Sequence, residues 1–280
     1  MKIALRVAEW IAGFDLDRVS SEVRERACLC CLDTVGVALA GTGAPSVRAA
    51  ARAFASDGAY GFWGLGQSGA HAGACFVNAT AASALDLDDG YALVVGHAAS
   101  SMVPAVLTTA QRAEVSGREA LEAVIVGYEV AVRAALARED TRVDALSSGG
   151  FTPLGVAAAL GRLRGLSVTQ QAHALAIAAA YRPQAPLVVS LAEGAMVKES
   201  IGWAALAGAQ AVALAAEGFE GALTILDREG AEAPWLGDLG AAGFATLPVV
   251  NRSPSGCAHS GRAHSARCAA VAPDATRPIR

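Results

Sequence analysis

One cluster of carboxylates stands out in this sequence, the run Asp86-Leu87-Asp88-Asp89-Gly90-Tyr91, and His97 follows it in the same irregular stretch. The run comes directly after an alanine-rich apolar segment, where three acids are costly to bury unless they bind or cap something. Acids that face a cleft with raised pKa values, beside a histidine, suit general acid–base catalysis. The alternative interpretation is a solvated acidic turn at a helix end and a histidine that is only hydrogen-bonded within the fold.

A lysine lies in a second apolar setting, Gly194-Ala195-Met196-Val197-Lys198-Glu199, at the start of another alanine-rich run. An ammonium is expensive to desolvate there, and a helix N-terminus already favours anions, so together they would hold a carboxylate. The alternative is a surface lysine whose aliphatic stem covers apolar groups. The turn Ser147-Ser148-Gly149-Gly150-Phe151-Thr152-Pro153 offers further N–H groups and hydroxyls at the start of a helix.

The cysteines do not have the spacing of a metal site. Zinc sites combine a C-x₂₋₄-C pair with a second Cys or His pair, and no second pair stands near Cys28 and Cys31. We expect these two to be small buried residues on one face of a helix, and we predict no metal ligands in the chain. The six cysteines are Cys28, Cys30, Cys31, Cys75, Cys257 and Cys268.

Composition decides which elements must position these groups. The 280 residues are 54% hydrophobic and 17% charged, which excludes a disordered chain. Aromatic residues make up only 5%, and the alanine content is high, so helices are favoured over sheets. The length fits one or two domains. We predict an all-α fold.

Charge and hydropathy limit the partners. The net charge of −4 and pI of about 5.7 leave no basic surface for a nucleic acid. The mean hydropathy of +0.40 raises the question of a membrane span, but charged residues interrupt every apolar stretch, and the start lacks the apolar run of a signal peptide. We expect a cytoplasmic protein with no membrane or nucleic-acid partner.

Apolar residues recur at helical spacing along most of the chain. Capping boxes at Ser116–Glu119 and Ser167–Gln170 mark two helix starts. A short hairpin is expected at 59–66, and Pro104 is expected in the first turn of its helix. Helices are predicted over 4–14, 20–40, 45–56, 70–84, 103 onward, 116–137, 153–163, 167–181 and 198–217. We predict a helical domain over 1–250 and an irregular tail over 251–280, whose Ser, Arg, Ala, His and Pro residues show no period.

These stretches, in this order, resemble the MmgE/PrpD family, which includes 2-methylcitrate dehydratase, cis-aconitate decarboxylase and iminodisuccinate epimerase. The similarity spans roughly residues 1–230. The segments that carry it are Ala84-Leu85-Asp86-Leu87-Asp88-Asp89 with the loop histidine, Ser116-Gly117-Arg118-Glu119 with Gly127-Tyr128-Glu129-Val130, Gly150-Phe151 before a proline-started helix, and Gly194-Ala195-Met196-Val197-Lys198.

The resemblance implies a large helical domain that carries most of the site, followed by a smaller α+β domain that closes over it. It also implies no metal or organic cofactor and a homodimer formed through the helical domain. Because 251–280 has no strand pattern, we expect this α+β lid to be truncated or absent, with the tail as a remnant of its start. The cleft should then be wider and wetter than in the family, and turnover of 2-methylcitrate or cis-aconitate very poor.

Carried over by position, Asp86 and His97 correspond to the acid–base residues and Lys198 to the lysine that contacts a substrate carboxylate. We expect Gly90, Tyr91 and Thr152 to line the same substrate site. Gly90 stands where the family usually has threonine. Thr152 stands where it usually has histidine.

The function we expect is that of a cofactor-independent lyase or isomerase on a small di- or tricarboxylate. Proton transfer at a carbon next to a carboxylate would accompany dehydration, decarboxylation or epimerisation. One alternative is a truncated, non-catalytic relative that binds a ligand or partner. A remote alternative is Mg²⁺-dependent diphosphate chemistry, in which the acidic run would hold the metal.

Overall fold

The computed structural model describes residues 2–91, 94–137, 147–184 and 187–227. These residues are mostly helical, so the predicted all-α fold is confirmed. The predicted boundary at residue 250, the tail 251–280, Cys257 and Cys268 lie outside the described residues. The described α-helices are α1 (Ile3–Ala12), α2 (Ser21–Gly41), α3 (Pro45–Phe54), α4 (His71–Ser83), α5 (Ala99–Ala110), α6 (Gly117–Leu136), α7 (Thr152–Leu163), α8 (Val168–Ala180), α9 (Leu187–Ala192) and α10 (Ile201–Ala216).

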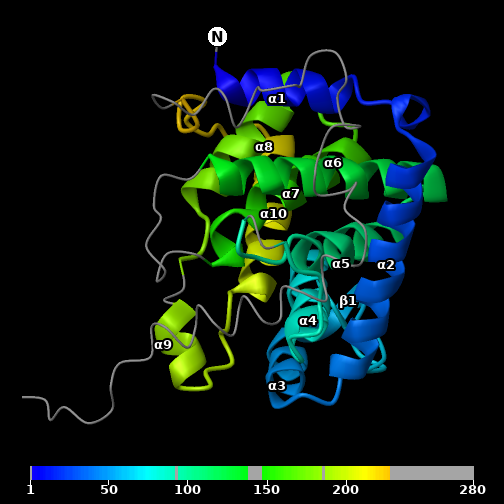
Figure 1. The fold of residues 1–280 in the computed structure, drawn as a ribbon, viewed down its shortest axis with the longest axis vertical. Helices are drawn as coiled ribbons and strands as arrows, with labels where there is room; N and C mark the ends of the chain where they lie inside the picture. Colours follow the sequence, from blue (N-terminus) through cyan, green and yellow to red (C-terminus); the bar gives the residue numbers. More distant parts are fainter. Residues whose placement is uncertain (1, 92–93, 138–146, 185–186, 228–280) are drawn as a thin grey trace, which may run out of the picture.

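Helix α7 runs through the centre of the fold. Residues 152–161 of this helix are all buried, and it packs against α5, α6, α8 and α10. Figure 1 shows α1 on one side of it and α4 with α5 on the other. Helices α6 and α7 approach closely, because a methyl group added at Gly155 would lie 2.5 Å from the carbonyl oxygen of Gly127. Alanine and glycine thus permit a dense helical core.

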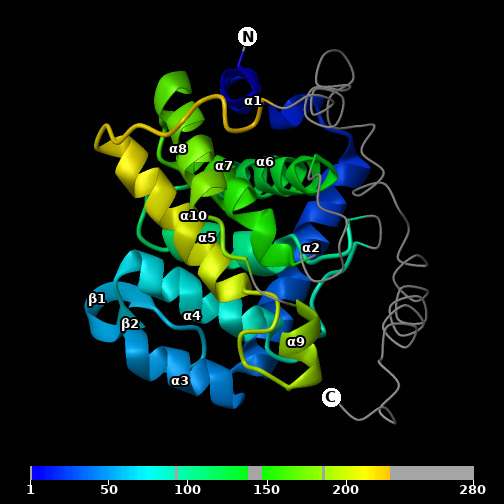
Figure 2. The same ribbon diagram turned by 90° about the vertical axis from the view of Figure 1, so that its left-hand side faces the viewer.

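Local sequence signals set several helix starts. The hydroxyl of Ser20 caps α2, and Ser116 and Ser167 form the predicted capping boxes of α6 and α8. A hairpin is present where one was predicted, but it extends beyond 59–66: β1 (Ala55–Gly61) pairs antiparallel with β2 (Ser68–Gly69). Figure 2 shows it beside α3 and α4. Residues near each other in sequence determine these features.

Two predicted helix starts need correction. Helix α5 begins at Ala99 rather than near 103, because Asp89 Oδ1 accepts the N–H of Ala99 at 3.1 Å, and Pro104 therefore lies inside the helix. Helix α10 begins at Ile201 rather than 198, because Ser200 has a left-handed backbone with φ 60°. The short helix α9 was not predicted.

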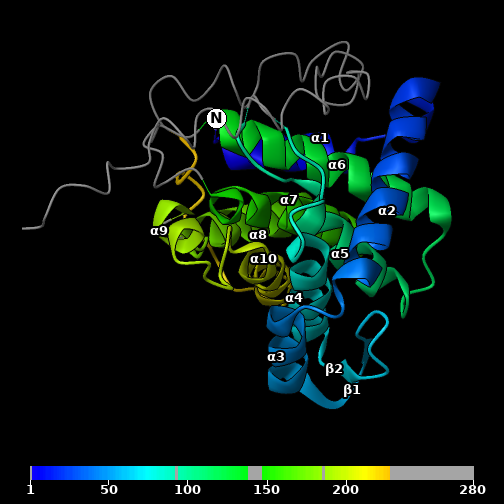
Figure 3. The ribbon, with the colours of Figure 1, turned by 60° about the horizontal axis from the view of Figure 1, so that its bottom comes forward.

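Helix α2 lies at the edge of the molecule, on the opposite side from α9 (Figure 3). Its buried face carries Val23, Ala27, Thr34 and Ala38. Cys28 is exposed and Cys31 is half-buried, so the expectation that both are buried is wrong. Within the described residues no helix taken alone has the length and apolar content to cross a membrane; α2 and α3 reach that threshold only as a pair, with a 91° bend between them.

Candidate functional site

Two irregular segments meet at the candidate site: the described part of 84–98, between α4 and α5, and 193–200, between α9 and α10. They lie beside the 3₁₀ turn η3 (Ser148–Gly150), which leads into α7. In the described residues, the non-glycine residues with left-handed backbone are Asp86, Val95, Lys198 and Ser200 (φ 59°, 48°, 44° and 60°). All four belong to these two segments. Such strain costs about 1–3 kcal/mol per residue and clusters at functional sites.

Lys198 and Asp86 form the exposed part of the site. Lys198 Nζ lies 3.1 Å from Asp86 Oδ1 and donates to the carbonyl oxygen of Ser83 at 2.7 Å. Ser83 is the last residue of α4, so the ammonium sits at the negative end of that helix. The Asp86 side chain is 66% exposed and that of Lys198 24%. A ligand can therefore reach both.

The predicted setting of Lys198 needs correction. It was expected at the N-terminus of a buried helix, where helix and ammonium would both attract an anion. Because α10 starts at Ile201, the ammonium is instead placed at the C-terminal end of α4. Its attraction for an anion rests on its own charge.

His97 forms the inner part of the site, between two carboxylates. Its Nε2 lies 3.3 Å from Oε1 of Glu199, and its Nδ1 lies 3.5 Å from Oδ2 of Asp88 and 2.5 Å from the carbonyl oxygen of Asp89. Burial alone would lower the pKa of His97. The hydrogen bond to Glu199 and the charges of Asp88, Glu199 and Asp89 outweigh burial and raise it to about 10.

The pKa values of the carboxylates around His97 are shifted in different directions. Burial raises the pKa of Asp88, opposed by the charge of His97 and a hydrogen bond from Ser100. Burial likewise raises the pKa of Asp89 to about 6, opposed by the charge of His97 and by the hydrogen bond that Tyr128 donates to Oδ2 at 3.0 Å. Burial also pushes the pKa of Glu199 upward, but bonding and charge from His97 and hydrogen bonds from Ser148 lower it overall.

The outer and inner parts belong to one electrostatic environment. The charge of Lys198 acts on the pKa of Asp88, and Asp88 is in turn an ion-pair partner of His97. Asp88 Oδ1 is buried and has no hydrogen-bond partner among the described residues. The site thus combines two cations with four carboxylates and an unsatisfied acceptor, which is a setting for proton transfer and for binding a charged ligand.

The structure places the predicted site residues at different points of the fold. Asp86 and Lys198 are in contact. Gly90 is beside His97, since a Cβ there would lie 3.9 Å from Cε1 of the ring. Tyr91 pairs through its backbone with Gly96, and its ring packs against the core.

Thr152 is fully buried, and its hydroxyl donates to the carbonyl oxygen of Ser148 at 2.9 Å. Thr152 is therefore enclosed in the core, unlike the exposed Asp86–Lys198 pair. The catalytic and substrate-binding roles remain predictions.

Four residues of the site carry functions that the sequence alone did not assign. Asp88 and Asp89 are buried partners of His97 and α5, and Glu199 with Ser148 joins His97 to η3. The D-x-D-D spacing pointed to the two aspartates. No local signal linked Glu199 to Ser148, which lies 51 positions away. The hydroxyls of Ser147 and Ser148, expected to be open to a ligand, are both donated to Glu199.

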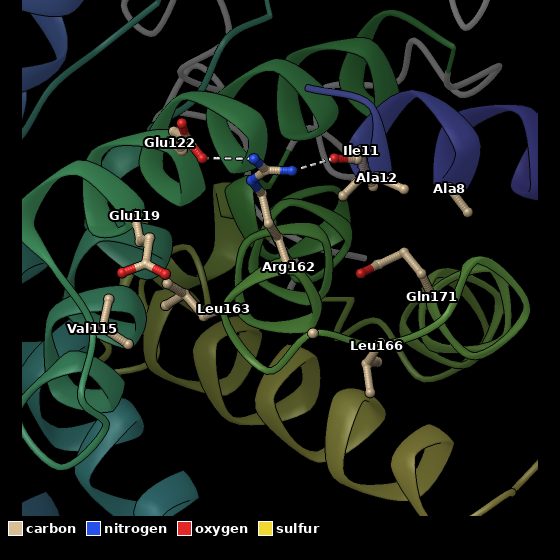
Figure 4. Close-up of a pocket in the computed structure, with 11 residues that line it drawn as sticks. Ala8, Ile11, Ala12, Val115, Glu119, Glu122, Arg162, Leu163, Leu166 and Gln171 are labelled. Carbon is tan, nitrogen blue, oxygen red and sulfur yellow. Dashed lines mark hydrogen bonds and ion pairs between the residues drawn. The ribbon is translucent and has the colours of Figure 1, made fainter. Parts of the chain in front are cut away.

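A pocket of about 360 Å³ lies at the other end of α7, between α1, α6 and α8 (Figure 4). In this pocket, Arg162 donates to the carbonyl oxygens of Ile11 at 2.6 Å and Phe14 at 2.8 Å, and it pairs with Glu122 at 2.6 Å. These bonds hold the end of α1 against α7. The charges of this pocket therefore serve the fold, and the site is assigned to the strained segments.

The acidic run does not converge on one point. Asp86 pairs with Lys198, Asp88 accepts from Ser100, and Asp89 accepts from Tyr128. In the described part of the chain, no three His, Cys, Asp or Glu side chains are grouped so that they could hold a metal ion.

Comparison with known proteins links this geometry to a family. Residues 5–238 match the model of the MmgE/PrpD N-terminal domain. Two sequences of cis-aconitate decarboxylase from Aspergillus terreus are each 30% identical over 241 residues, covering 81% of this chain and 48% of the relative. A cis-aconitate decarboxylase-like protein, oryM, from Aspergillus oryzae is 26% identical over 241 residues, covering 81% and 49%. The chain spans about half the length of the curated relatives it matches.

Proposed function

Because the chain belongs to the MmgE/PrpD family, we propose that it is a lyase or isomerase acting on a small di- or tricarboxylate. The reaction moves a proton at a carbon next to a carboxylate, coupled to loss of CO₂, loss of water or inversion of that carbon. The observation that carries the proposal is the exposed Asp86–Lys198 pair on two strained turns, together with His97, which is half-buried between Asp88 and Glu199. The relatives named cis-aconitate decarboxylase make decarboxylation the first reaction to test.

Lys198 is the proposed carboxylate-binding group. An ammonium has three donors, and in the described residues two of them are directed to Ser83 and Asp86. The third remains for a substrate carboxylate. His97 adds a second positive charge nearby, which favours substrates with more than one carboxylate, although Asp88 and Glu199 offset part of it.

Asp86 is the proposed proton acceptor and His97 the proposed donor. As a base, Asp86 takes the proton from the substrate carbon; in dehydration the departing hydroxide takes a proton from the acid. In decarboxylation the C–C bond to the leaving carboxylate breaks, and the electron pair left on carbon is protonated. With a pKa of about 10, His97 begins the cycle carrying its proton.

A non-catalytic carboxylate-binding protein is the second candidate. It is favoured by Thr152, which occupies the position of a histidine expected from the family resemblance and is fully buried. The two functions share the binding step and differ in turnover.

A panel of small di- and tricarboxylates, cis-aconitate among them, tests the proposal by ¹H NMR of reaction mixtures. We expect one acid to be consumed with a new product signal. Saturation-transfer signals from a bound acid without consumption would favour the second candidate. The family resemblance also leads us to propose a homodimer, which light scattering tests.

A further inference from the structure

We propose that Glu199 is a positioning residue that fixes His97 as an oriented, doubly protonated imidazolium and ties it to the η3 turn. The inference rests on the proposed function only for what His97 does to a substrate. The positioning itself concerns the protein alone and is tested without substrate.

The hydrogen-bond partners of His97 define its protons. Nδ1 lies 2.5 Å from the carbonyl oxygen of Asp89, which can only accept, so Nδ1 carries a proton. Nε2 lies 3.3 Å from Oε1 of Glu199. The other oxygen, Oε2, accepts from the hydroxyl and backbone N–H of Ser148, as an ionised carboxylate does. Despite burial, bonding and charge from His97 and hydrogen bonds from Ser148 hold the pKa of Glu199 below its usual value, so the carboxylate is ionised and Nε2 carries a proton as well.

A closed ring of two hydrogen bonds and one ion pair holds this arrangement. The backbone N–H of His97 donates to Ser148 Oγ at 2.9 Å, Ser148 Oγ donates to Glu199 Oε2, and Glu199 Oε1 returns to the ring of His97. Ser148 is fully buried and Glu199 is 7% exposed. Because Ser148 and Glu199 are buried, the His97 side chain is only 17% exposed and each member is bonded to the next, the ring should be rigid.

The backbone of Glu199 makes a second attachment to the same turn. Its carbonyl oxygen accepts from Gly149 N at 2.9 Å and Ser147 Oγ at 2.8 Å. The left-handed backbone of Lys198 lies immediately before it. The two adjacent side chains therefore contact different partners: Lys198 contacts Asp86, and Glu199 contacts His97.

Other charged and titratable groups limit the effect that Glu199 can have on the protonation of His97. Asp88 Oδ2 lies 3.5 Å from Nδ1 of His97 and is not removed by a change at Glu199, so only part of the stabilisation of the imidazolium should be lost. The groups facing this part of the site are Asp88 and Asp89 from the loop before α5, Lys198 and Glu199 from the segment before α10, Tyr128 from α6 and Cys30 from α2.

The test is NMR of the full chain with ¹⁵N-labelled imidazole rings, titrated from pH 6 to 9. His97→Gln assigns the His97 signals by removing them. In the wild type we expect both ring nitrogens of His97 to stay protonated to pH 8. Glu199→Gln should lower the pKa of His97 by about 1–3 units, the usual effect of removing one close opposite charge. Glu193→Gln, an exposed acid just upstream, should leave it unchanged.

A neutral His97 ring in the wild type at pH 7 would overturn the proposal, as would an unchanged pKa in folded Glu199→Gln. If Glu199→Gln does not fold, the wild-type spectrum and Ser148→Ala decide. Ser148→Ala keeps the charge of Glu199 but opens the ring, so we expect His97 to stay protonated and its ring to become more mobile by ¹⁵N relaxation. Unchanged mobility would count against positioning.

These results separate the two proposals. A protonated, Glu199-dependent His97 in a protein that turns over no carboxylate leaves the positioning intact and removes the proposed function. If the wild type turns over a carboxylate but Glu199→Gln leaves the pKa of His97 unchanged, the proposed function stands and the positioning role of Glu199 falls.

Discussion

Lys198 and Asp86 are 112 positions apart in the sequence, yet Nζ of one lies 3.1 Å from Oδ1 of the other. Both residues have a left-handed backbone, with φ 44° and 59°. Such a conformation persists only where the surrounding structure enforces it. The contact therefore joins two strained turns, and the predictions below test whether that strain serves a site.

Lys198→Met should weaken carboxylate binding by about 10- to 100-fold, because a charge-assisted hydrogen bond contributes about 1.5–3 kcal/mol. Lys2, the other lysine of the chain, provides the matched control Lys2→Met. Titration calorimetry with a tricarboxylate and its monoester measures the effect. The tricarboxylate should lose more affinity, and equal binding of both acids by the wild type would remove the role of Lys198.

The same Lys198→Met variant should lose at most about 1 kcal/mol of stability, the usual value of an exposed ion pair. The carbonyl oxygen of Ser83 loses the ammonium but keeps the backbone N–H of Asp86 as a donor at 3.3 Å. A side chain that is 24% exposed is not a buried charge, so its removal should not stabilise the fold. Urea unfolding measures the difference.

Asp86→Asn should lower kcat about 10²- to 10⁴-fold, because the amide keeps the shape of the side chain but cannot take a proton. The melting temperature should change little, since the side chain is 66% exposed. Asp33→Asn, at an exposed position of α2, is the control. A folded Asp86→Asn variant with wild-type kcat would show that Asp86 is not the base.

Features set by neighbouring residues were predictable, and features set across the fold were not. The capping boxes at Ser116 and Ser167 need only three following residues, and both are present. The start of α5 depends on Asp89, which binds Ala99 from outside the helix. Apolar periodicity says nothing of such a bond, so the helix was predicted to start too late.

The site shows the same division. The acidic run and Lys198 were recognisable because charges in alanine-rich surroundings are unusual. Which acid would be exposed and which buried depended on a single turn, the left-handed backbone of Asp86. Glu199 was not recognisable, because its partner Ser148 comes from a turn 51 positions away.

Stability should fall as pH rises from about 6.5 towards 10. The folded pKa of His97 is about 10 and an unfolded histidine has a pKa near 6.5, so its stabilisation is complete below pH 6.5 and is lost as pH rises through the folded pKa. By pH 9 the loss should reach about 3 kcal/mol at most, at about 1.4 kcal/mol per pH unit.

The pKa values of Asp89, raised to about 6, and Glu129, raised to about 7, also make stability fall as pH rises, but mostly at lower pH. His97→Gln should therefore flatten the decline between pH 7 and 9. His173→Gln is the control, because His173 contacts the backbone of Gly221 rather than a carboxylate. Urea unfolding at each pH measures the slopes, and parallel slopes for wild type and His97→Gln would contradict the account.

Arg162→Met should destabilise the protein by about 2–4 kcal/mol, because it removes the hydrogen bonds to the carbonyl oxygens of Ile11 and Phe14 and the ion pair with Glu122. Arg164→Met, at an exposed position two residues on, is the control. Thermal unfolding measures both. Carboxylate affinity should be retained in each folded variant, and its loss in Arg162→Met alone would mean that the pocket of Figure 4 takes part in binding.

Deuterium uptake from D₂O tests the central claim most directly, because it reports proton transfer at carbon whichever net reaction follows. The wild type and Lys2→Met are incubated with cis-aconitate and other small di- and tricarboxylates, beside Asp86→Asn and Lys198→Met, and NMR follows deuterium at the carbon next to a carboxylate. We predict uptake into one acid or its product by the wild type and Lys2→Met, and at least about 10-fold slower uptake by the other two variants. No uptake into any acid by the folded wild type, or equal rates in wild type and Asp86→Asn, would contradict a catalytic site at Asp86 and Lys198.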